Sequence, residues 1–160
     1  MQHEVTISRE KTGLGHREAA GLIKKAVHMA LDAEGINVPC IVNVMLTDDE
    51  GIHAVNKEFR NVDRATDVLS FPFNELTPGA FDPNLCEKDM DSGAVLLGDM
   101  MISVPRCEAQ GEEFGHGYER ELMYLTVHSV LHLLGYDHLD EGEQKRQMRA
   151  REKAIMGDKD

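Results

Sequence analysis

The chain has 160 residues, enough for one domain with a sizeable buried core. Hydrophobic residues make up 41% and charged residues 29%, which excludes a wholly disordered chain, and no apolar run approaches the length of a membrane helix. The formal net charge of −12 excludes a broad basic surface that coats nucleic acid, so any phosphate contact has to be local.

The cysteines and the first residues indicate a reducing compartment. Cys40, Cys86 and Cys107 are odd in number and widely spaced, with no CxxC pair, so we expect small buried or surface thiols. Residues 1–10 are polar and lack the apolar core of a signal peptide. These features predict a cytoplasmic protein.

The first half of the chain alternates strand and helix patterns. Val5 and Ile7 alternate with polar neighbours and predict a short strand, and the apolar spacing over 17–34 predicts a helix that Gly35 ends. The β-branched segment 38–47 predicts a largely buried strand. Asp48, Asp49 and Glu50 then begin a short helix whose apolar side is formed by Ile52, Val55 and Phe59.

The second half begins with strands and ends with helices. Segments 66–73 and 94–104 predict two strands, and 74–93, rich in Pro, Asp and Asn, predicts a long surface loop between them. From residue 118 the pattern is helical, with a break at Gly135 and a second helix that Asp140 and Glu143 would cap. The order predicts an α+β fold over 1–160, a single domain with a small mixed sheet of about four strands packed by helices.

The helix over 118–134 carries the first chemical signal. At 100° per residue it is apolar around most of its circumference, except for a narrow sector that holds Glu121, His128 and His132. Histidines four residues apart lie one turn apart on one face, so their imidazoles can converge on one ion. Gly135 allows the chain to reverse, which brings His138 within reach.

The pattern HxxxHxxGxxH therefore predicts one zinc ion bound by three histidines. Three imidazoles with an open fourth position are typical of a catalytic zinc site, and no cysteine lies near to close it, although nickel or another borderline ion would also suit them. Asp137 and Asp140 either accept hydrogen bonds from the outer nitrogens of the ligands or serve as turn and cap residues.

The spacing also matches the HExxHxxGxxH helix of the metzincin proteases, with one difference. Ser129 follows the first histidine, where those proteases carry the glutamate that takes a proton from water. A serine hydroxyl has far too high a pKa to act as that base near neutrality. The chain is thus expected to have a metzincin-like zinc-binding helix, with peptide hydrolysis only as the alternative chemistry.

The segment HSVLHLLGYDH, residues 128–138, resembles the signature of the YbeY family of rRNA maturation factors. Further segments resemble that family in order and spacing over essentially the whole chain: NKEFR at 56–60, TDVLSFP at 66–72, Gly98-Asp99 with Ile102-Ser103, and Met148 with Glu152.

The resemblance implies a zinc-dependent endoribonuclease specific for single-stranded RNA, which acts in 3′-end maturation of 16S rRNA and in ribosome quality control in the bacterial cytoplasm. It implies precursor 16S rRNA and the ribosome or its small subunit as partners, and neither a membrane nor DNA. The alternatives are a zinc hydrolase of a non-RNA substrate, such as a peptide, and a ribosome-assembly factor with a mainly structural zinc site.

Arg60 matches the arginine that the family places at its zinc cleft. A guanidinium grips two phosphate oxygens and stays charged, so it suits the charge that develops during phosphodiester cleavage. The alternative is a surface arginine that ends a helix. Glu121 is a candidate proton acceptor or a solvent-facing residue. The basic residues of the last helix, Lys145, Arg146, Arg149, Arg151 and Lys153, either contact RNA or form a solvated face.

Overall fold

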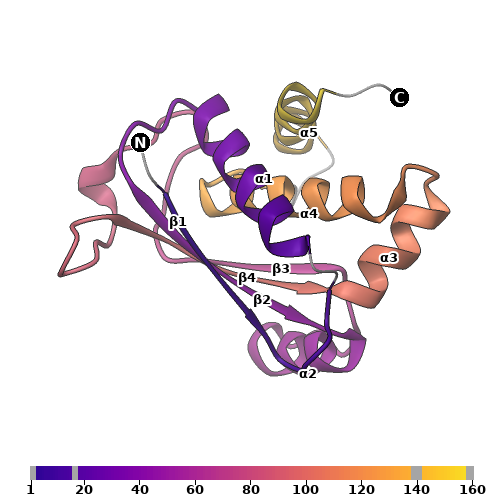
Figure 1. Ribbon diagram of the computed structural model, residues 1–160. Helices are drawn as coiled ribbons and strands as arrows, with labels where there is room; N and C mark the ends of the chain where they lie inside the picture. Colours follow the sequence, from indigo (N-terminus) through magenta and orange to yellow (C-terminus); the bar gives the residue numbers. More distant parts are fainter. Residues whose placement is uncertain (1–2, 16–17, 138–141, 158–160) are drawn as a thin grey trace.

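In the computed structural model of the chain, the described residues are 3–15, 18–137 and 142–157. Strands and helices alternate at first, and three helices follow the last strand (Figure 1). In chain order the elements are β1 (Glu4–Arg9), α1 (Ala19–Ala33), β2 (Cys40–Thr47), α2 (Asp49–Arg60), β3 (Val68–Pro72), η1 (Pro83–Leu85), β4 (Val95–Ser103), α3 (Val104–Glu113), α4 (Gly117–Leu133) and α5 (Glu143–Met156).

The strands form one sheet in the order β1-β2-β4-β3. β1 and β4 both run parallel to β2, whereas β3 pairs antiparallel with β4 and forms an edge. Pro72, which cannot donate a backbone hydrogen bond, ends this edge strand, where prolines are tolerated. The prediction of an α+β fold with a mixed sheet of about four strands is confirmed.

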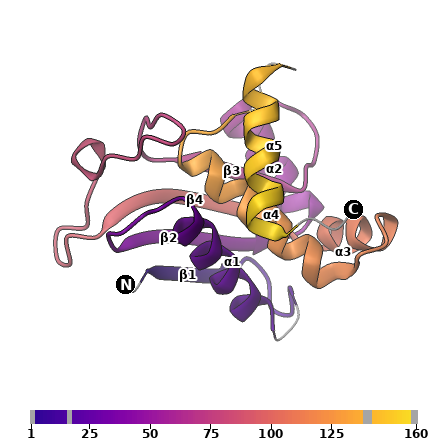
Figure 2. The same ribbon diagram turned by 90° about the horizontal axis from the view of Figure 1, so that it is seen from above.

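The helices cover both faces of the sheet. α1, α4 and α5 lie on one side and α2 on the other (Figure 1), and α5 lies across α4 (Figure 2). α4 is apolar on nearly all sides because α1, α3, α5 and the sheet all pack against it. Its fully buried apolar side chains, Leu122, Val127, Val130, Leu131 and Leu133, belong to the core. The histidine helix is therefore a central element of the fold, as predicted.

One helix was not predicted from the sequence. The strand pattern over 94–104 was confirmed as β4, but the chain continues directly into α3. Pro105 lies in the first turn of α3, where its missing N–H leaves no hydrogen bond unmade. Only Val104, Cys107 and Gly111 of α3 are buried, and this narrow stripe of small residues is a weak apolar pattern.

The three thiols are free, as expected. Burial raises the pKa of Cys40 and of Cys107 to about 12, so both remain protonated and inert near neutrality. Within the described ranges, none of the helices combines the length and the apolar character needed to span a bilayer.

Candidate metal centre

α4 ends in a tight turn that the sequence predicted at Gly135. The backbone N–H of Gly135 donates to the His132 carbonyl at 3.0 Å, and that of Tyr136 donates to the Leu131 carbonyl at 3.0 Å. Gly135 has φ +104°, and a Cβ there would overlap the backbone carbonyl of Leu76. Glycine is required both for the reversal and for the close approach of the 73–82 segment.

His128 and His132 converge as the helical spacing predicted. Their Nε2 atoms lie 3.2 Å apart, and the two rings meet edge to face. The Nδ1 of His132 lies 3.0 Å from the Tyr136 carbonyl oxygen, and the Nδ1 of His128 lies 2.5 Å from Glu152 Oε2. Because a carbonyl and a carboxylate only accept, each Nδ1 carries the proton and each Nε2 presents a lone pair.

This geometry fits a zinc ion. Two lone pairs that face each other repel unless a cation lies between them. Two nitrogens bound to one zinc at about 2.0–2.1 Å with a tetrahedral angle lie about 3.3 Å apart, close to the observed 3.2 Å. Each imidazole also has an acceptor at its outer nitrogen, as zinc-binding histidines usually do.

The third predicted ligand, His138, lies outside the described residues, as does Asp140. Accordingly, residues 3–15, 18–137 and 142–157 alone contain no group of three His, Cys, Asp or Glu side chains placed to bind a metal. The described part of the chain thus holds two converging imidazoles, and the complete three-histidine set remains a prediction.

Glu152 is the site residue whose role the sequence did not reveal. It is 6% exposed, and its Oε1 accepts from the Tyr124 hydroxyl at 2.9 Å while its Oε2 accepts from His128. Burial alone would raise the pKa of Glu152, but the hydrogen bonds from His128 and Tyr124 outweigh burial and lower that pKa, so the carboxylate stays ionised. Sequence reasoning looked for such an acceptor at Asp137 or Asp140.

A signal for Glu152 was nevertheless present. It shares the apolar stripe of α5 with Met148 and Ile155, both buried. A lone carboxylate on a buried helix face requires a buried partner, because an unpaired charge there is strongly destabilising.

Ser129 of α4 contacts the edge strand β3. It is fully buried, and its Oγ lies 2.6 Å from the Oγ of Ser70 on β3. The residue that stands where metzincins carry their base thus fastens α4 to the edge strand. This contact explains the serine of TDVLSFP as well as the serine of the histidine motif.

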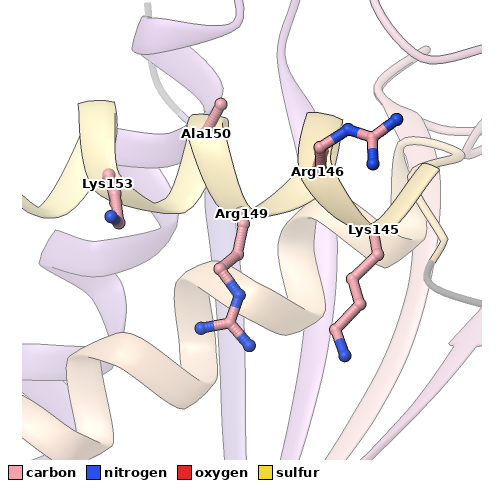
Figure 3. Close-up of a pocket in the computed structure, with 5 residues that line it drawn as sticks. All are labelled: Lys145, Arg146, Arg149, Ala150 and Lys153. Carbon is pink, nitrogen blue, oxygen red and sulfur yellow. The ribbon is translucent and has the colours of Figure 1, made fainter. Parts of the chain in front are cut away.

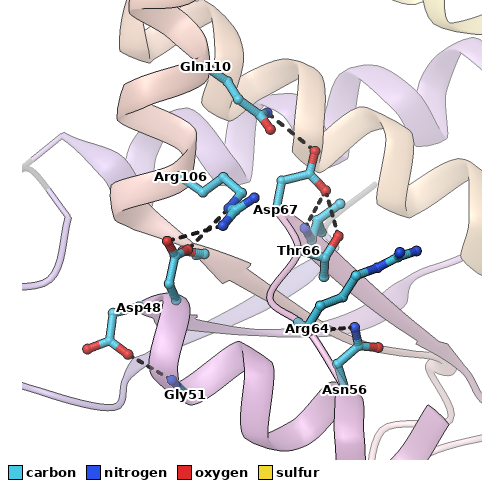
Figure 4. Close-up of polar contacts among 11 residues, drawn as sticks. Asp48, Gly51, Asn56, Arg64, Thr66, Asp67, Arg106 and Gln110 are labelled. Carbon is cyan, nitrogen blue, oxygen red and sulfur yellow. Dashed lines mark hydrogen bonds and ion pairs between the residues drawn. The ribbon is translucent and has the colours of Figure 1, made fainter. Parts of the chain in front are cut away.

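Arg60 is the last residue of α2 and is exposed. Asn61 ends the helix in the left-handed conformation at φ 60°. Buried Asn56 fixes the turn, because its Nδ2 donates to the Arg64 carbonyl at 3.0 Å (Figure 4). Among the described residues, Arg60 makes no hydrogen bond or ion pair, so the fold leaves its guanidinium available.

The segment after Arg60 is held at its other end by Asp67. Its Oδ1 accepts from the backbone N–H of Val68 at 2.7 Å, and its Oδ2 accepts from Gln110 of α3 at 3.3 Å (Figure 4). The 61–67 segment is thereby attached to α2, β3 and α3 at once. Asn56 and Asp67, which belong to the NKEFR and TDVLSFP segments, act as structural residues.

Glu121 is buried, at 1% exposure, so the alternative that it faces solvent is wrong. Its Oε1 lies 2.6 Å from His116 Nε2, and its Oε2 accepts from Gln110 Nε2 at 2.8 Å. Both carboxylate oxygens are engaged in fastening α4 to α3 and to the turn before α4. The geometry gives Glu121 a structural task and no contact with His128 or His132.

Comparison with known proteins shows the family of the chain. A profile of the family described as endoribonuclease YbeY matches residues 4–159. A protein named endoribonuclease YbeY from Clostridium botulinum (strain 657 / Type Ba4) is 42% identical over 147 residues, which cover 88% of this chain and 88% of the relative. One of the same name from Clostridium kluyveri is 43% identical over 141 residues, covering 84% and 85%.

A solution structure of a Thermotoga maritima protein is similar in fold. It superposes with a TM-score of 0.54 at 26% sequence identity, over 96% of this chain and 89% of that protein. The sequence matches extend over nearly all of the chain, including β1 to α5. The chain belongs to the endoribonuclease YbeY family.

Proposed function

We propose that this protein is a zinc-dependent endoribonuclease that cleaves single-stranded RNA and acts in 3′-end maturation of 16S rRNA and in ribosome quality control. One domain over residues 1–160 would carry this activity. The substrate would be precursor 16S rRNA on the ribosome or its small subunit, in the cytoplasm, with no role for DNA or a membrane. The observation that carries the proposal is the convergence of His128 and His132 in a chain of the YbeY family.

Each residue of the proposed site has a separate role. His128, His132 and His138 would hold one zinc ion, and Glu152 and the Tyr136 carbonyl orient the first two rings. When bound, zinc supplies a Lewis acid and lowers the pKa of a coordinated water. Arg60, held at the end of α2, would pair with the nonbridging phosphate oxygens and stabilise the negative charge that develops on them.

The position of Ser129 supports RNA over peptide as the substrate. With the Ser129 hydroxyl bonded to Ser70 inside the fold, the helix offers no carboxylate where a metzincin protease has its base. The net charge of −12 is compatible with RNA only if few phosphates are contacted, so RNA affinity should fall only gently with salt.

The proposal is tested by cleavage of a precursor 16S 3′-end substrate on ribosomes, with zinc content measured for every variant. His128→Ala should lose bound zinc and cleavage together. Arg60→Ala should keep its zinc and lose about 100-fold or more in kcat, in line with removal of one charge-stabilising group. Lys24→Ala, which removes an exposed charge of α1, is the matched control and should cleave as the wild type does.

The same assay distinguishes the alternatives. Cleavage that survives both His128→Ala and Arg60→Ala would remove the ribonuclease proposal and favour an assembly factor with a structural zinc. Hydrolysis of unstructured peptides by the zinc-loaded wild type, without RNA cleavage, would favour the hydrolase of a non-RNA substrate.

A further inference from the structure

Basic side chains gather on one flank of α5. Lys145, Arg146, Arg149 and Lys153 line a hollow of about 420 Å³ together with Ala150 (Figure 3). Among the described residues, no acidic side chain lines this hollow. In a chain with a net charge of −12, a concave surface whose described lining consists of four cations and one alanine is a candidate local site for an anion.

The helical spacing orders these cations in a row. Lys145, Arg149 and Lys153 are four residues apart, so they follow one another along one side of α5 at intervals of about 6 Å. In Figure 3, Lys145 and Arg149 both extend from α5 in the direction of α4. This interval is comparable to the distance between successive phosphates of an extended single strand, so each cation of the row can contact one phosphate.

The row lies on the flank of α5 that is turned away from α1. On the opposite flank, Arg151 Nε donates to Glu34 Oε2 at 2.6 Å, and its Nη2 donates to the Ala33 carbonyl at 3.2 Å. Arg151 therefore attaches α5 to the end of α1. In the row Lys145-Arg149-Lys153, the side chains of Arg149 and Lys153 are exposed.

The row also adjoins the histidines. Arg149 lies one turn before Glu152 on α5, and Lys153 directly follows Glu152. Glu152 in turn bonds to His128, and its Oε1 accepts from Tyr124. A strand whose phosphates lay along the row would thus pass beside the predicted zinc site.

We propose that the basic hollow of α5 binds the backbone phosphates of the RNA strand that enters the metal centre. This inference rests on the proposed function and deepens it, by naming the surface that holds the strand while Arg60 acts at the reacting phosphate. Arg146, which pairs with Glu143 at 3.2 Å, flanks the row. RNA is favoured over an acidic protein because the row adjoins the metal centre of a chain in an endoribonuclease family.

The test measures binding of a labelled single-stranded RNA oligonucleotide to the zinc-loaded protein at several salt concentrations. Lys145→Gln/Arg149→Gln is compared with Lys24→Gln/Lys25→Gln, which removes two exposed charges from α1 and so changes the net charge equally. The α5 pair should weaken binding about 10-fold or more at low salt and flatten the slope of log K against log salt by about 1.4. The α1 pair should leave the slope unchanged.

The kinetic constants of RNA cleavage provide the second measurement. The α5 pair should raise KM for RNA while kcat stays within about twofold, because these residues hold the strand and do not act on the reacting phosphate. Should the half-buried Lys145 prove necessary for folding, Arg149→Gln/Lys153→Gln, both exposed, provides the same test.

The outcomes separate this inference from the proposed function. If the α5 pair has the same slope and KM as the wild type and still cleaves RNA, the inference is overturned and the proposed function is not. The same result is expected if the hollow binds an acidic protein. A wild type that binds RNA but does not cleave it would overturn the proposed function, and a flattened slope in the α5 pair would then still support the hollow as the RNA-binding surface.

Discussion

Glu152 of α5 bonds to His128 of α4 across 24 residues of chain, with 2.5 Å between Oε2 and Nδ1. This one contact joins the last helix to the predicted zinc site. Glu152→Ala should therefore weaken zinc binding by about 10–100-fold, because the imidazole loses the acceptor that sets its tautomer and orientation. The affinity is measured by competition with a chromophoric chelator.

Two further variants test this prediction, one with a smaller expected effect and one with none. Tyr124→Phe removes only the second hydrogen bond of the carboxylate and should have a smaller effect in the same direction. Glu112→Ala, which truncates an exposed glutamate of α3, should bind zinc as the wild type does. Equal zinc affinity in Glu152→Ala and Glu112→Ala would show that the carboxylate does not orient a ligand.

The hydroxyl pair of half-buried Ser70 and fully buried Ser129 predicts an effect on stability. Either serine changed to alanine leaves the hydroxyl of its partner, which is half-buried or buried, with an unmade hydrogen bond, and this should cost about 1–3 kcal/mol. Ser70→Ala/Ser129→Ala should cost less than the sum of the single changes, because no polar group is then left unsatisfied. Urea unfolding of the four proteins measures this coupling, and strictly additive losses would contradict it.

Ser129→Glu restores the HExxH pattern of the proteases, yet it should not create a peptidase. The added carboxylate would be forced into the fully buried contact with β3, so we expect a severe loss of stability. Peptide hydrolysis by a stably folded Ser129→Glu protein would show that this side chain can turn toward the histidines.

Much of the fold could be predicted because the patterns were local. The alternation at Val5 and Ile7, the β-branched run of β2 and the Asp48 cap of α2 each depend on neighbours along the chain. α3 was missed because its buried stripe is narrow and follows β4 without a turn residue.

The candidate site was predictable only within α4. His128 and His132 lie on one helix, so their spacing alone brings them together. Glu152 reaches them from another helix, and Glu121 is buried by contacts from α3 and from His116. No spacing along the chain encodes how α5 and α3 pack on α4, so these partners required the structure.

A substitution at Gly135 tests the turn that ends α4, and a substitution at a second glycine serves as the control. Gly135→Ala combines a strained backbone at φ +104° with an overlap on the Leu76 carbonyl, so the free energy of unfolding should fall by at least about 2 kcal/mol. Gly21→Ala lies in α1 with open space around the added methyl group and should stabilise the protein by about 0.5–1 kcal/mol. A loss of similar size at both positions would contradict this account.

The contacts of Asp49 predict how the stability of the fold depends on pH. Its carboxylate joins the start of α2 to the start of α3, accepting from Ser103 Oγ at 2.7 Å and from Arg106 Nε at 3.3 Å. Burial alone would raise the pKa of Asp49, but the hydrogen bonds from Arg106 and Ser103 lower it below the ordinary 3.8. A carboxylate whose pKa is lower in the folded than in the unfolded state stabilises the fold at pH values above its unfolded-state pKa. This stabilisation is lost as the pH falls through its folded-state pKa.

Asp49→Asn should therefore unfold at a lower urea concentration than the wild type at pH 7, and the difference should shrink as the pH falls through the lowered folded-state pKa of Asp49. The effect should be modest, because the Asp49 side chain is 47% exposed and water screens the pair. Asp91→Asn, in an exposed loop, removes the same charge and should show no such pH dependence. A difference between wild type and Asp49→Asn that does not shrink as the pH is lowered would mean that the ionised carboxylate is not what joins α2 to α3.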